Sequence, residues 1–361
     1  MERLDKIATL SKGIGISKEQ LSNGGEPCIL YGELYTKYKS EIIKEIYSKT
    51  DIDNSKLKKS KANDVIIPCS GETAVDIATA RCVPFDNILL GGDLNVISLH
   101  QYDGAFMSYQ LNGKRKYDIA KVAQGVSVVH LYGEHLKTIK TCNPTLQEQK
   151  KIAKLLSLLD ERIATQNKII EDLKKLKSAI SLKLLHSDSW EQFRIKDIAS
   201  IGRGRVISSI EISQQENPLY PVYSSQTSND GIMGYLDDFM FEGEYISWTT
   251  DGANAGTVFY RNGKFNCTNV CGLLKLKKGF DAHFVSLVLA EATKRYVSTN
   301  LANPKLMNNT MGDIQICLPQ LEDQKRISVV FRKLQGLLET HNTLIVKYSK
   351  QKQYLLSQMF I

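Results

Sequence analysis

Two stretches of the chain share a long alternation of apolar and polar positions. In residues 144–187 apolar residues recur at spacings of three and four, and the same pattern returns in residues 319–361. Such a repeat predicts a coiled-coil seam about 40 residues long, or roughly 60 Å at 1.5 Å per residue. The seam positions are Ile152, Leu156, Leu159, Ile163, Ile170, Leu173, Ile180 and Leu184 in the first stretch, and Ile327, Phe331, Leu334, Leu338, Ile345, Tyr348, Leu355 and Met359 in the second.

The two stretches are copies of one another, displaced by a constant 175 positions. Even the polar residues that interrupt the seams coincide, because Gln166 and Lys177 fall on His341 and Lys352. Matching seams with matching interruptions favour packing of the two helices on each other. The alternative is that each helix lies separately on its own globular domain. We expect the polar interruptions to set the register of the pair.

The first helix has a recognisable start. Thr145 and Glu148 follow Pro144 in the S/T-x-x-E pattern of a capping box. In that motif each side chain accepts a hydrogen bond from the backbone amide of the other residue. The pattern therefore predicts that the helix begins directly after Pro144.

The segments before the two helices, residues 1–143 and 188–318, read as mixed α/β domains. Strand-like apolar runs such as 27–35, 64–72 and 87–99 are bounded by Gly, Asn and Asp. Residues 4–13 match 195–204, with Lys12 opposite Arg203, and residues 64–71 resemble 244–252. We therefore predict an α+β protein, with two similar mixed α/β domains joined by two long helices packed as an antiparallel coiled coil.

Composition narrows the class of protein. The chain has 361 residues, of which 42% are hydrophobic and 24% charged, as in ordinary globular proteins. It contains no run of about 18 apolar residues and no signal-peptide pattern, so we expect no membrane span. Seven cysteines at irregular spacings favour reduced thiols and a cytoplasmic location. The net charge of +8 is compatible with a polyanionic partner without establishing one.

None of the short motifs predicts catalysis. The tetrapeptide at 217–220 differs from the NPPY of amino-methyltransferases, and 201–206 is not a dinucleotide-binding loop. Cys267 and Cys271 lack the second Cys/His pair that a zinc site needs. Ser70 lacks the G-x-S-x-G context of a nucleophile, and the six histidines are scattered. We therefore expect neither catalytic residues nor a metal site.

Polar, glycine-marked stretches at 31–39, 224–231 and 249–256 are better candidates for recognition. Amides, hydroxyls and carboxylates bond base edges, tyrosines stack, and basic side chains hold phosphates. The alternative for each stretch is an ordinary turn or solvated surface. The candidate DNA-binding residues are Lys12, Tyr31, Glu33, Tyr35, Lys37, Ser70, Lys114, Arg203, Arg205, Ser225, Gln226, Thr227, Asn229, Thr250 and Asn254.

The repeated P-x-L-x-x-Q-K-x-I pattern, followed by a long seam helix after each of two variable domains, resembles the specificity (S, HsdS) subunit of type I restriction-modification enzymes. The likeness extends over essentially the whole chain, including residues 220–238 and 251–260. It implies that residues 1–143 and 188–318 are target-recognition domains. Each would read one half of a bipartite, asymmetric site in double-stranded DNA.

The same resemblance implies the roles of the helices and partners. The helices would set the half-site spacing and dock two modification subunits, which bind S-adenosylmethionine; restriction subunits would join with ATP and Mg²⁺. This chain itself would be non-catalytic and hold no cofactor. Residues expected in helix packing and partner binding are Gln149, Ile152, Leu156, Leu159, Ile163, Gln324, Ile327, Phe331, Leu334 and Leu338.

Two further points stay open at this stage. The first domain has almost nothing before Leu4, whereas Trp190–Phe193 opens the second, so we expect a shortened lead-in. A coiled-coil scaffold whose two heads bind protein or carbohydrate would also explain the helices and mixed domains. An enzyme in its own right is the third alternative.

Overall fold

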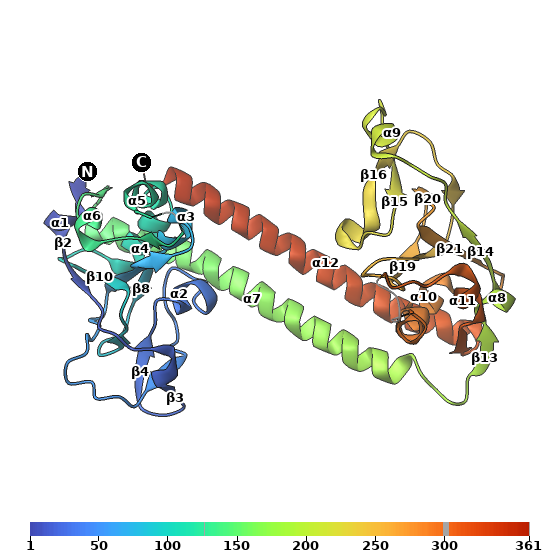
Figure 1. Ribbon diagram of the computed structural model, residues 1–361, viewed down its shortest axis with the longest axis horizontal. Helices are drawn as coiled ribbons and strands as arrows, with labels where there is room; N and C mark the ends of the chain where they lie inside the picture. Colours follow the sequence, from blue (N-terminus) through green and yellow to red (C-terminus); the bar gives the residue numbers. More distant parts are fainter. Residues whose placement is uncertain (126, 299–302, 361) are drawn as a thin grey trace. The chain divides into compact units, whose positions relative to one another are not determined.

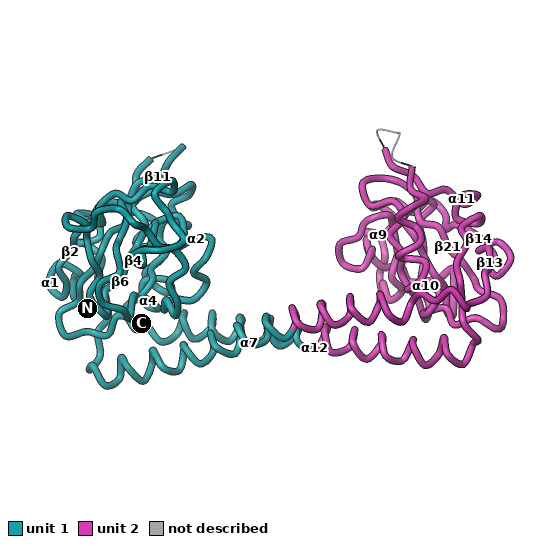
Figure 2. Tube along the Cα trace, turned by 90° about the horizontal axis from the view of Figure 1, so that it is seen from below, with its two compact units in different colours: residues 1–169, 341–361 teal, residues 170–340 magenta. Residues whose placement is uncertain are grey.

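The chain forms two compact units, each made of one head and part of each long helix. The computed structural model describes residues 1–125, 127–298 and 303–360. Unit 1 comprises residues 1–169 and 341–361, and unit 2 comprises residues 170–340 (Figure 2). Among the described residues, no helix combines the length and apolar character that crossing a membrane requires.

The two predicted helices are α7 (Leu146–Leu184) and α12 (Leu321–Gln358), and they pack together (Figure 1). The capping box predicted for α7 is confirmed. The Thr145 amide donates to Glu148 Oε2 at 3.1 Å, and the Glu148 amide donates to Thr145 Oγ1 at 3.3 Å. The predicted α+β class, with two similar heads and two packed helices, is likewise confirmed.

The polar interruptions of the seams meet across the helix pair. In unit 1, Gln166 Oε1 bonds His341 Nδ1 and Lys352 Nζ donates to Asp160 Oδ1 at 2.6 Å. In unit 2, Lys177 Nζ donates to Gln335 Oε1 at 3.2 Å. Gln166 and His341 are each other's copies, and the two lysine contacts are copies of one contact. An antiparallel pair of repeats has this arrangement.

Head 1, the globular part of unit 1, is built on a four-stranded antiparallel sheet in the order β2-β10-β6-β8. The middle strand β6 is buried at all five residues because apolar side chains cover both of its faces. The short strand β1, of two residues, pairs with β12. These elements are β1 (Glu2–Arg3), α1 (Leu4–Ile7), β2 (Ala8–Lys12), β6 (Asp64–Pro68), β8 (Arg81–Val83), β10 (Leu94–Leu99), α4 (Gly104–Asn112) and β12 (Lys140–Thr141).

Head 2, the globular part of unit 2, repeats this design. Its sheet has the order β14-β21-β18-β19, and the four-residue strand β13 pairs with β22. The core contains Trp248, whose indole nitrogen donates to the Leu306 carbonyl at 2.9 Å. The elements are β13 (Glu191–Arg194), α8 (Ile195–Ile198), β14 (Ala199–Arg203), β18 (Tyr245–Thr249), β19 (Val258–Arg261), β21 (Cys271–Leu276), α10 (Ala282–Ala292), α11 (Asn308–Asp313) and β22 (Gln315–Leu318).

The heads differ in their second sheets, β3-β5-β4-β9 in head 1 and β16-β15-β20-β17 in head 2. Short elements complete each head. They are β3 (Leu21–Ser22), β4 (Glu26–Ile29), α2 (Glu33–Thr36), β5 (Ser48–Thr50), β7 (Ser70–Gly71), α3 (Ala74–Ile77), β9 (Leu89–Leu90), α5 (Lys116–Val122), β11 (Val129–His130) and α6 (Gly133–Leu136), and in head 2 α9 (Ser209–Ser213), β15 (Tyr220–Tyr223), β16 (Ile232–Leu236), β17 (Phe241–Glu242) and β20 (Lys264–Cys267).

One strand-like run is divided in the structure. Residues 27–35 read as a single apolar run, but β4 ends at Ile29 and α2 begins at Glu33. The Glu33 carboxylate accepts a hydrogen bond from the Leu30 amide at 3.0 Å. This contact closes a tight turn between β4 and α2. In a continuous strand the Glu33 carboxylate would not reach the Leu30 amide and would be buried without that donor.

Each long helix is fastened to its own head by the same glutamine. Gln149 Oε1 accepts from the Asp103 amide at 2.9 Å, and Gln149 Nε2 donates to the Pro144 carbonyl at 2.7 Å. Its copy, Gln324, bonds the Asp281 amide and the Pro319 carbonyl at 2.9 and 2.8 Å. Both glutamines are almost fully buried. The amides they bond belong to the N-caps of α4 and α10.

Candidate nucleic-acid interface

In head 1 the recognition candidates gather at one edge of the main sheet. Strand β2 ends at Lys12 and β6 ends at Pro68, and both ends lie opposite the start of β10. Ser70 therefore follows at the edge where Lys12 lies. The Leu131 amide, from the segment before α6, donates to the Cys69 carbonyl at 2.8 Å and closes this edge.

Head 2 has the corresponding edge. Strand β14 ends at Arg203 and β18 ends at Thr249, and both ends lie opposite the start of β21. The Leu306 amide donates to the Thr250 carbonyl at 2.8 Å, as Leu131 does to Cys69 in head 1. The duplication thus places a basic strand end and a polar turn side by side in both heads. We call this feature the recognition edge.

Three adjoining clefts hollow the surface of head 1 around its recognition edge. They have volumes of about 740, 480 and 1190 Å³. The first two share Ser70, the last two share Lys12, and the first and third share Tyr31. The structure therefore brings together six of the seven candidates in this head, namely Lys12, Tyr31, Glu33, Tyr35, Lys37 and Ser70.

Glu33 requires a correction, because its carboxylate is buried. It accepts hydrogen bonds from the Leu30 amide, from Lys37 Nζ at 2.7 Å and from the Ser48 hydroxyl. The Glu33 side chain is 8% exposed, so a cytosine amine has little access to this carboxylate. Glu33 instead shapes the turn that presents Tyr31 and holds Lys37 beside the cleft.

Tyr35 and Ser70 are bonded to each other across the cleft. The Tyr35 hydroxyl donates to the Ser70 carbonyl at 3.0 Å, and the Ser70 hydroxyl lies 3.3 Å from His130 Nδ1. Burial raises the pKa of Tyr35 well above its usual value, so the phenol is neutral and acts as a donor. The Ser70 hydroxyl is half-buried and lines two of the clefts.

The two arginines proposed for head 2 have different surroundings. Arg203 Nε donates to Asn308 Oδ1 at 2.9 Å and its Nη1 donates to the Asn269 carbonyl at 3.2 Å. These neutral partners leave its positive charge uncompensated at the recognition edge. Arg205 instead pairs with the Glu211 carboxylate, and this contact raises its pKa and offsets its charge. Arg203 is therefore the better candidate for a phosphate contact.

The turn 224–231 is held in an unusual conformation. Asn229, Asp230 and Gly231 have positive φ angles of 49°, 51° and 80° in succession. Left-handed conformations in consecutive non-glycine residues cost free energy and persist only where surrounding contacts hold them. Here the Ser224 amide donates to the Gly231 carbonyl at 2.9 Å, and Gln226 Nε2 donates to the Ile232 carbonyl. Ser225 and Thr227 are partly exposed, and Asn229 is exposed.

A buried cation lies close to this turn. The Arg261 guanidinium is stacked on the rings of Tyr223 and Phe259, with 3.6 and 4.4 Å to their centroids. Its Nε donates to the Ser247 hydroxyl at 2.9 Å, and burial lowers its pKa. A side chain on Gly231 would come within 3.2 Å of Arg261 Nη2. The glycine therefore lets the turn approach the arginine closely.

The remaining head candidates differ in accessibility. Thr250 is buried and its hydroxyl donates to the Val270 carbonyl at 2.9 Å, so its side chain is not available to a base. Asn254 is exposed, while its carbonyl accepts from the Thr249 and Thr257 hydroxyls. Lys114 is exposed but lines none of the three clefts that surround the recognition edge of head 1.

The helix residues singled out in the sequence serve packing within the chain. Leu156 belongs to the cluster that joins α7 to Phe106 and Tyr109 of α4. Its copy Phe331 joins the core of head 2. The others are buried or half-buried; they are Gln149, Ile152, Leu159, Ile163, Gln324, Ile327, Leu334 and Leu338. Outward-facing residues such as Leu155, Leu158, Val330 and Leu337 are exposed instead.

The positive charge of the chain is not spread evenly. Helix α7 carries nine Lys and Arg against five Asp and Glu, and α12 carries seven against three. Each helix therefore has a net charge of +4, and the two together account for the formal +8 of the whole chain. The heads are therefore neutral in sum, and their net charge does not by itself indicate a polyanion-binding surface.

The described residues contain no group of three or more His, Cys, Asp or Glu side chains arranged to hold a metal ion. All seven cysteines are free thiols, and the contact with Cys271, together with burial, raises the pKa of Cys267. Cys267 and Cys271 are inaccessible in the core of head 2.

Sequence reasoning missed part of the recognition edge. Tyr132, Met307 and Asn308 lie there, and none belongs to the polar stretches that drew attention. The sequence contains a signal for these positions. The 175-residue offset of the helices extends back to Leu131 and Leu306 and includes Cys142 and Cys317.

Known proteins share this sequence and architecture. The family described as type I restriction modification DNA specificity domain matches residues 1–175 and 187–347. A putative type I specificity subunit of Mycoplasma pneumoniae is 37% identical over 225 residues, covering 60% of this chain and 93% of the relative. The specificity subunit of the type I restriction enzyme MpnII from the same organism is 41% identical over 177 residues, covering 47% and 53%.

The fold also occurs in a solved structure. The crystal structure of a type I restriction-modification S subunit from M. genitalium has a TM-score of 0.74 and 19% identity, and it is matched over 100% of this chain and 95% of its own. The family is non-catalytic and carries no cofactor, since methylation and cleavage belong to the modification and restriction subunits. With matches across both heads and both helices, the chain belongs to the DNA specificity subunits of type I restriction-modification systems.

Proposed function

We propose that each head reads one half of a bipartite, asymmetric site in double-stranded DNA. The observation that carries this proposal is the duplicated recognition edge. Lys12 and Arg203 end equivalent strands, and each lies beside a polar turn. Basic side chains position a protein on phosphates, while polar groups beside them read base edges. Because the turns differ in sequence, the two half-sites differ as well.

We further propose that α7 and α12 set the spacing between the half-sites and dock two modification subunits. The supporting observation is the exposed apolar residues on the outer faces of both helices, among them Leu155 and its copy Val330. Equivalent positions on two repeats suit two copies of one partner. S-adenosylmethionine, ATP and Mg²⁺ would be bound by modification and restriction subunits, and the assembly would act in the cytoplasm.

Methylome sequencing tests the proposal in its natural setting. Deletion of the gene should abolish methylation of one bipartite adenine motif and leave other motifs unchanged. Replacing residues 188–318 by the corresponding segment of a relative should change one half of the motif only. A change in both halves, or in neither, would contradict the assignment of one half-site to each head.

A binding measurement tests the chemistry. Arg203→Ala, in complex with modification subunits, should lower the slope of log K against log salt by about one. Lys12→Ala should lower it by less, because Asp93 Oδ1 lies 3.4 Å from Lys12 Nζ and offsets part of its charge. Arg205→Ala is the matched control, because Glu211 already offsets its charge. Its salt dependence should stay close to that of the unaltered complex. Equal slopes for all four proteins would contradict phosphate binding at the recognition edge.

A further inference from the structure

We infer that Tyr132 in head 1 and Met307 in head 2 make apolar contacts with DNA bases and thereby help to select the sequence of each half-site. The inference rests on the proposed function, since it adds a second kind of contact to the recognition edge. The candidates predicted from the sequence are polar or basic, apart from the tyrosine rings. Bases also offer an apolar feature, the thymine methyl group, which proteins read by apolar contact and not by hydrogen bonds.

The two residues occupy the same place in the duplicated fold. Each follows the leucine whose amide closes the recognition edge, Leu131 at the Cys69 carbonyl and Leu306 at the Thr250 carbonyl. They are separated by the same 175 positions that relate the two helices. Each directly precedes a short helix, α6 or α11. A common backbone position therefore presents both side chains.

Both side chains are exposed although both are large and apolar in character. Tyr132 is 53% exposed and Met307 is 44% exposed, whereas the leucine before each is fully buried. A single exposed apolar side chain is common on protein surfaces and needs no explanation. An exposed one at the equivalent position of both heads, beside the strand-end cation in each, is a stronger sign of a contact surface.

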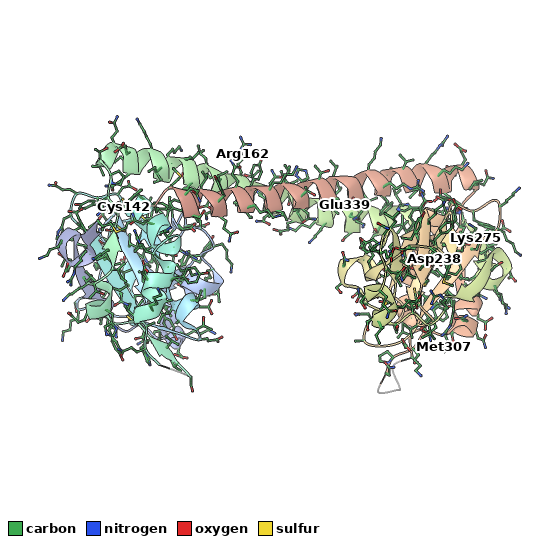
Figure 3. All side chains as sticks on the ribbon, turned by 90° about the horizontal axis from the view of Figure 1, so that it is seen from above. Cys142, Arg162, Asp238, Lys275, Met307 and Glu339 are labelled. Atoms are coloured by element: carbon green, nitrogen blue, oxygen red, sulfur yellow. The ribbon has the colours of Figure 1, made fainter. Side chains whose placement is uncertain are left out.

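Neighbouring groups hold each side chain in place. The Tyr132 ring is stacked on His130 at a centroid distance of 6.2 Å and meets the edge of His135 at 5.6 Å. Met307 Sδ lies 3.7 Å from Arg203 Nη2, which the Asn308 side chain also positions. Figure 3 shows Met307 on the side of unit 2 that faces away from the helices. Holding a side chain before binding reduces the entropy that binding must remove.

The surroundings match the chemistry of a nucleic-acid groove. Tyr132 lines the same 480 Å³ cleft as Lys12 and Ser70. Met307 touches Arg203, whose Nη1 also bonds the Asn269 carbonyl. In each head an exposed apolar side chain thus lies beside the strand-end cation, Lys12 or Arg203, and beside polar groups. The two differ in shape, because tyrosine is a rigid plane and methionine is flexible. They should therefore favour different bases.

Fluorescence anisotropy with the complete complex tests the inference. The probe is a labelled duplex carrying the bipartite motif found by methylome sequencing, and a duplex with both halves scrambled is the reference. Tyr132→Ala and Met307→Ala should each weaken binding to the motif about tenfold, in line with the loss of one base-pair contact, and leave binding to the scrambled duplex unchanged. Tyr132→Phe and Met307→Leu, which keep the apolar contact, should bind within about twofold of the unaltered protein.

Matched controls separate this effect from general damage. Tyr47 and Met240 are also exposed, at 56% and 39%, but line none of the clefts at the recognition edge and belong to neither edge. Tyr47→Ala and Met240→Ala should leave motif binding unchanged. Replacing single thymines of the motif by uracil removes only the methyl group. This change should weaken binding of the unaltered complex and should not further weaken binding of the complex that carries Met307→Ala.

The outcomes distinguish failure of the proposed function from failure of the inference about Tyr132 and Met307. If the unaltered complex binds motif and scrambled duplexes equally, the proposed function itself fails. If it discriminates between them and Tyr132→Ala and Met307→Ala discriminate equally well, the proposed function stands and this inference is overturned. Equal weakening on both duplexes also overturns it, because the residues would then contribute only general affinity.

Discussion

At each of its two ends the helix pair makes one contact that the repeat has kept and another that has diverged. Gln149 and Gln324 bond the N-caps of α4 and α10 in the same way. The lysine contacts differ. Lys352 is buried between Asp160 and Glu41, whereas its copy Lys177 donates to the neutral Gln335 near the surface. A duplicated backbone can therefore keep its hydrogen bonds while the charges around it change.

The charged contact in unit 1 is a closed network. Lys352, Asp160 and Glu41 are 15%, 8% and 10% exposed at their side chains. The Tyr109 hydroxyl and the Ser40 hydroxyl also donate to Asp160, at 2.7 and 3.1 Å. Burial raises the pKa of Glu41, while the nearby Lys352 ammonium acts in the opposite direction. Two carboxylates sharing one ammonium ion in a dry site depend on that cation.

The largest effect is expected for Lys352→Met. Removing the ammonium group leaves the buried Asp160 and Glu41 without their hydrogen-bonded cation, and Arg81 is the remaining positive charge that acts on both. Breaking a buried ion pair in this way typically costs about 3–5 kcal/mol. Hydrogen exchange followed by mass spectrometry should show loss of protection in α4 and the end of α12. The triple change Lys352→Met, Glu41→Gln, Asp160→Asn should recover much of the loss. Equal loss in the triple variant would contradict the explanation by unpaired charge.

A smaller effect, which depends on pH, is expected in unit 2. Burial lowers the pKa of His283 to about 4, and its ring bonds the Ser328 hydroxyl at 2.8 Å. The unfolded chain therefore binds the proton more readily, and stability is lost as the pH falls from about 6.5 towards 4. The pKa difference between 6.5 and 4 corresponds to at most about 3.4 kcal/mol. The measured loss should be smaller, because His283 is only half-buried and solvent screens its interactions.

Tryptophan fluorescence can measure this change in unit 2 alone, because both tryptophans, Trp190 and Trp248, lie there. Urea unfolding at several pH values should show the decline in the unaltered protein. His283→Gln, which does not titrate, should flatten the profile over this range. A profile unchanged by the substitution would assign the pH dependence to other groups.

The shared glutamines should give equal effects in the two units. Gln149→Ala and Gln324→Ala each remove two hydrogen bonds and leave a buried N-cap amide without its acceptor, at a cost of about 1–3 kcal/mol. Local hydrogen exchange should report the loss at the start of α4 for one variant and of α10 for the other. Costs that differ by more than about twofold would show that the contact has diverged in strength although not in geometry.

The smallest effect is expected for Lys177→Met. Its single exposed bond to Gln335 should contribute less than about 1 kcal/mol. This variant is the natural control for Lys352→Met, because both remove the same side chain from equivalent positions. A loss as large as that of Lys352→Met would refute the importance of burial and counter-charge.

Much of the architecture follows from local patterns. The seam of α7, its capping box and its copy in α12 depend on neighbours three or four positions apart, so the printed residues contain them directly. The repeat predicted an antiparallel pair and two similar heads, and both are present. The turn after Ile29 was missed, because its driving contact is a carboxylate reaching back to a backbone amide.

The candidate site was less predictable than the helices. Lys12, Ser70 and Arg203 remain predicted DNA contacts, and the structure places all three at strand ends on the recognition edges. Glu33 and Thr250 share the composition of their exposed neighbours, yet their side chains point inward. Burial depends on residues brought from distant parts of the chain, such as Ser48 for Glu33 and Val270 for Thr250. Local polarity does not encode that difference.

Periodicity and self-similarity are properties of the order of residues along the chain, and they are enough to predict the helix pair and the duplication. The family was indicated by the resemblance of the repeated motif and is shown by the matching family model. The chain order alone does not reveal which charges are buried, since Lys177 and Lys352 are identical residues at identical repeat positions. Their surroundings separate them, because Glu41 comes from head 1 and no matching carboxylate reaches Lys177 among the described residues. Folding brings those side chains together, and the low polarity of their surroundings strengthens the electrostatic interaction between them.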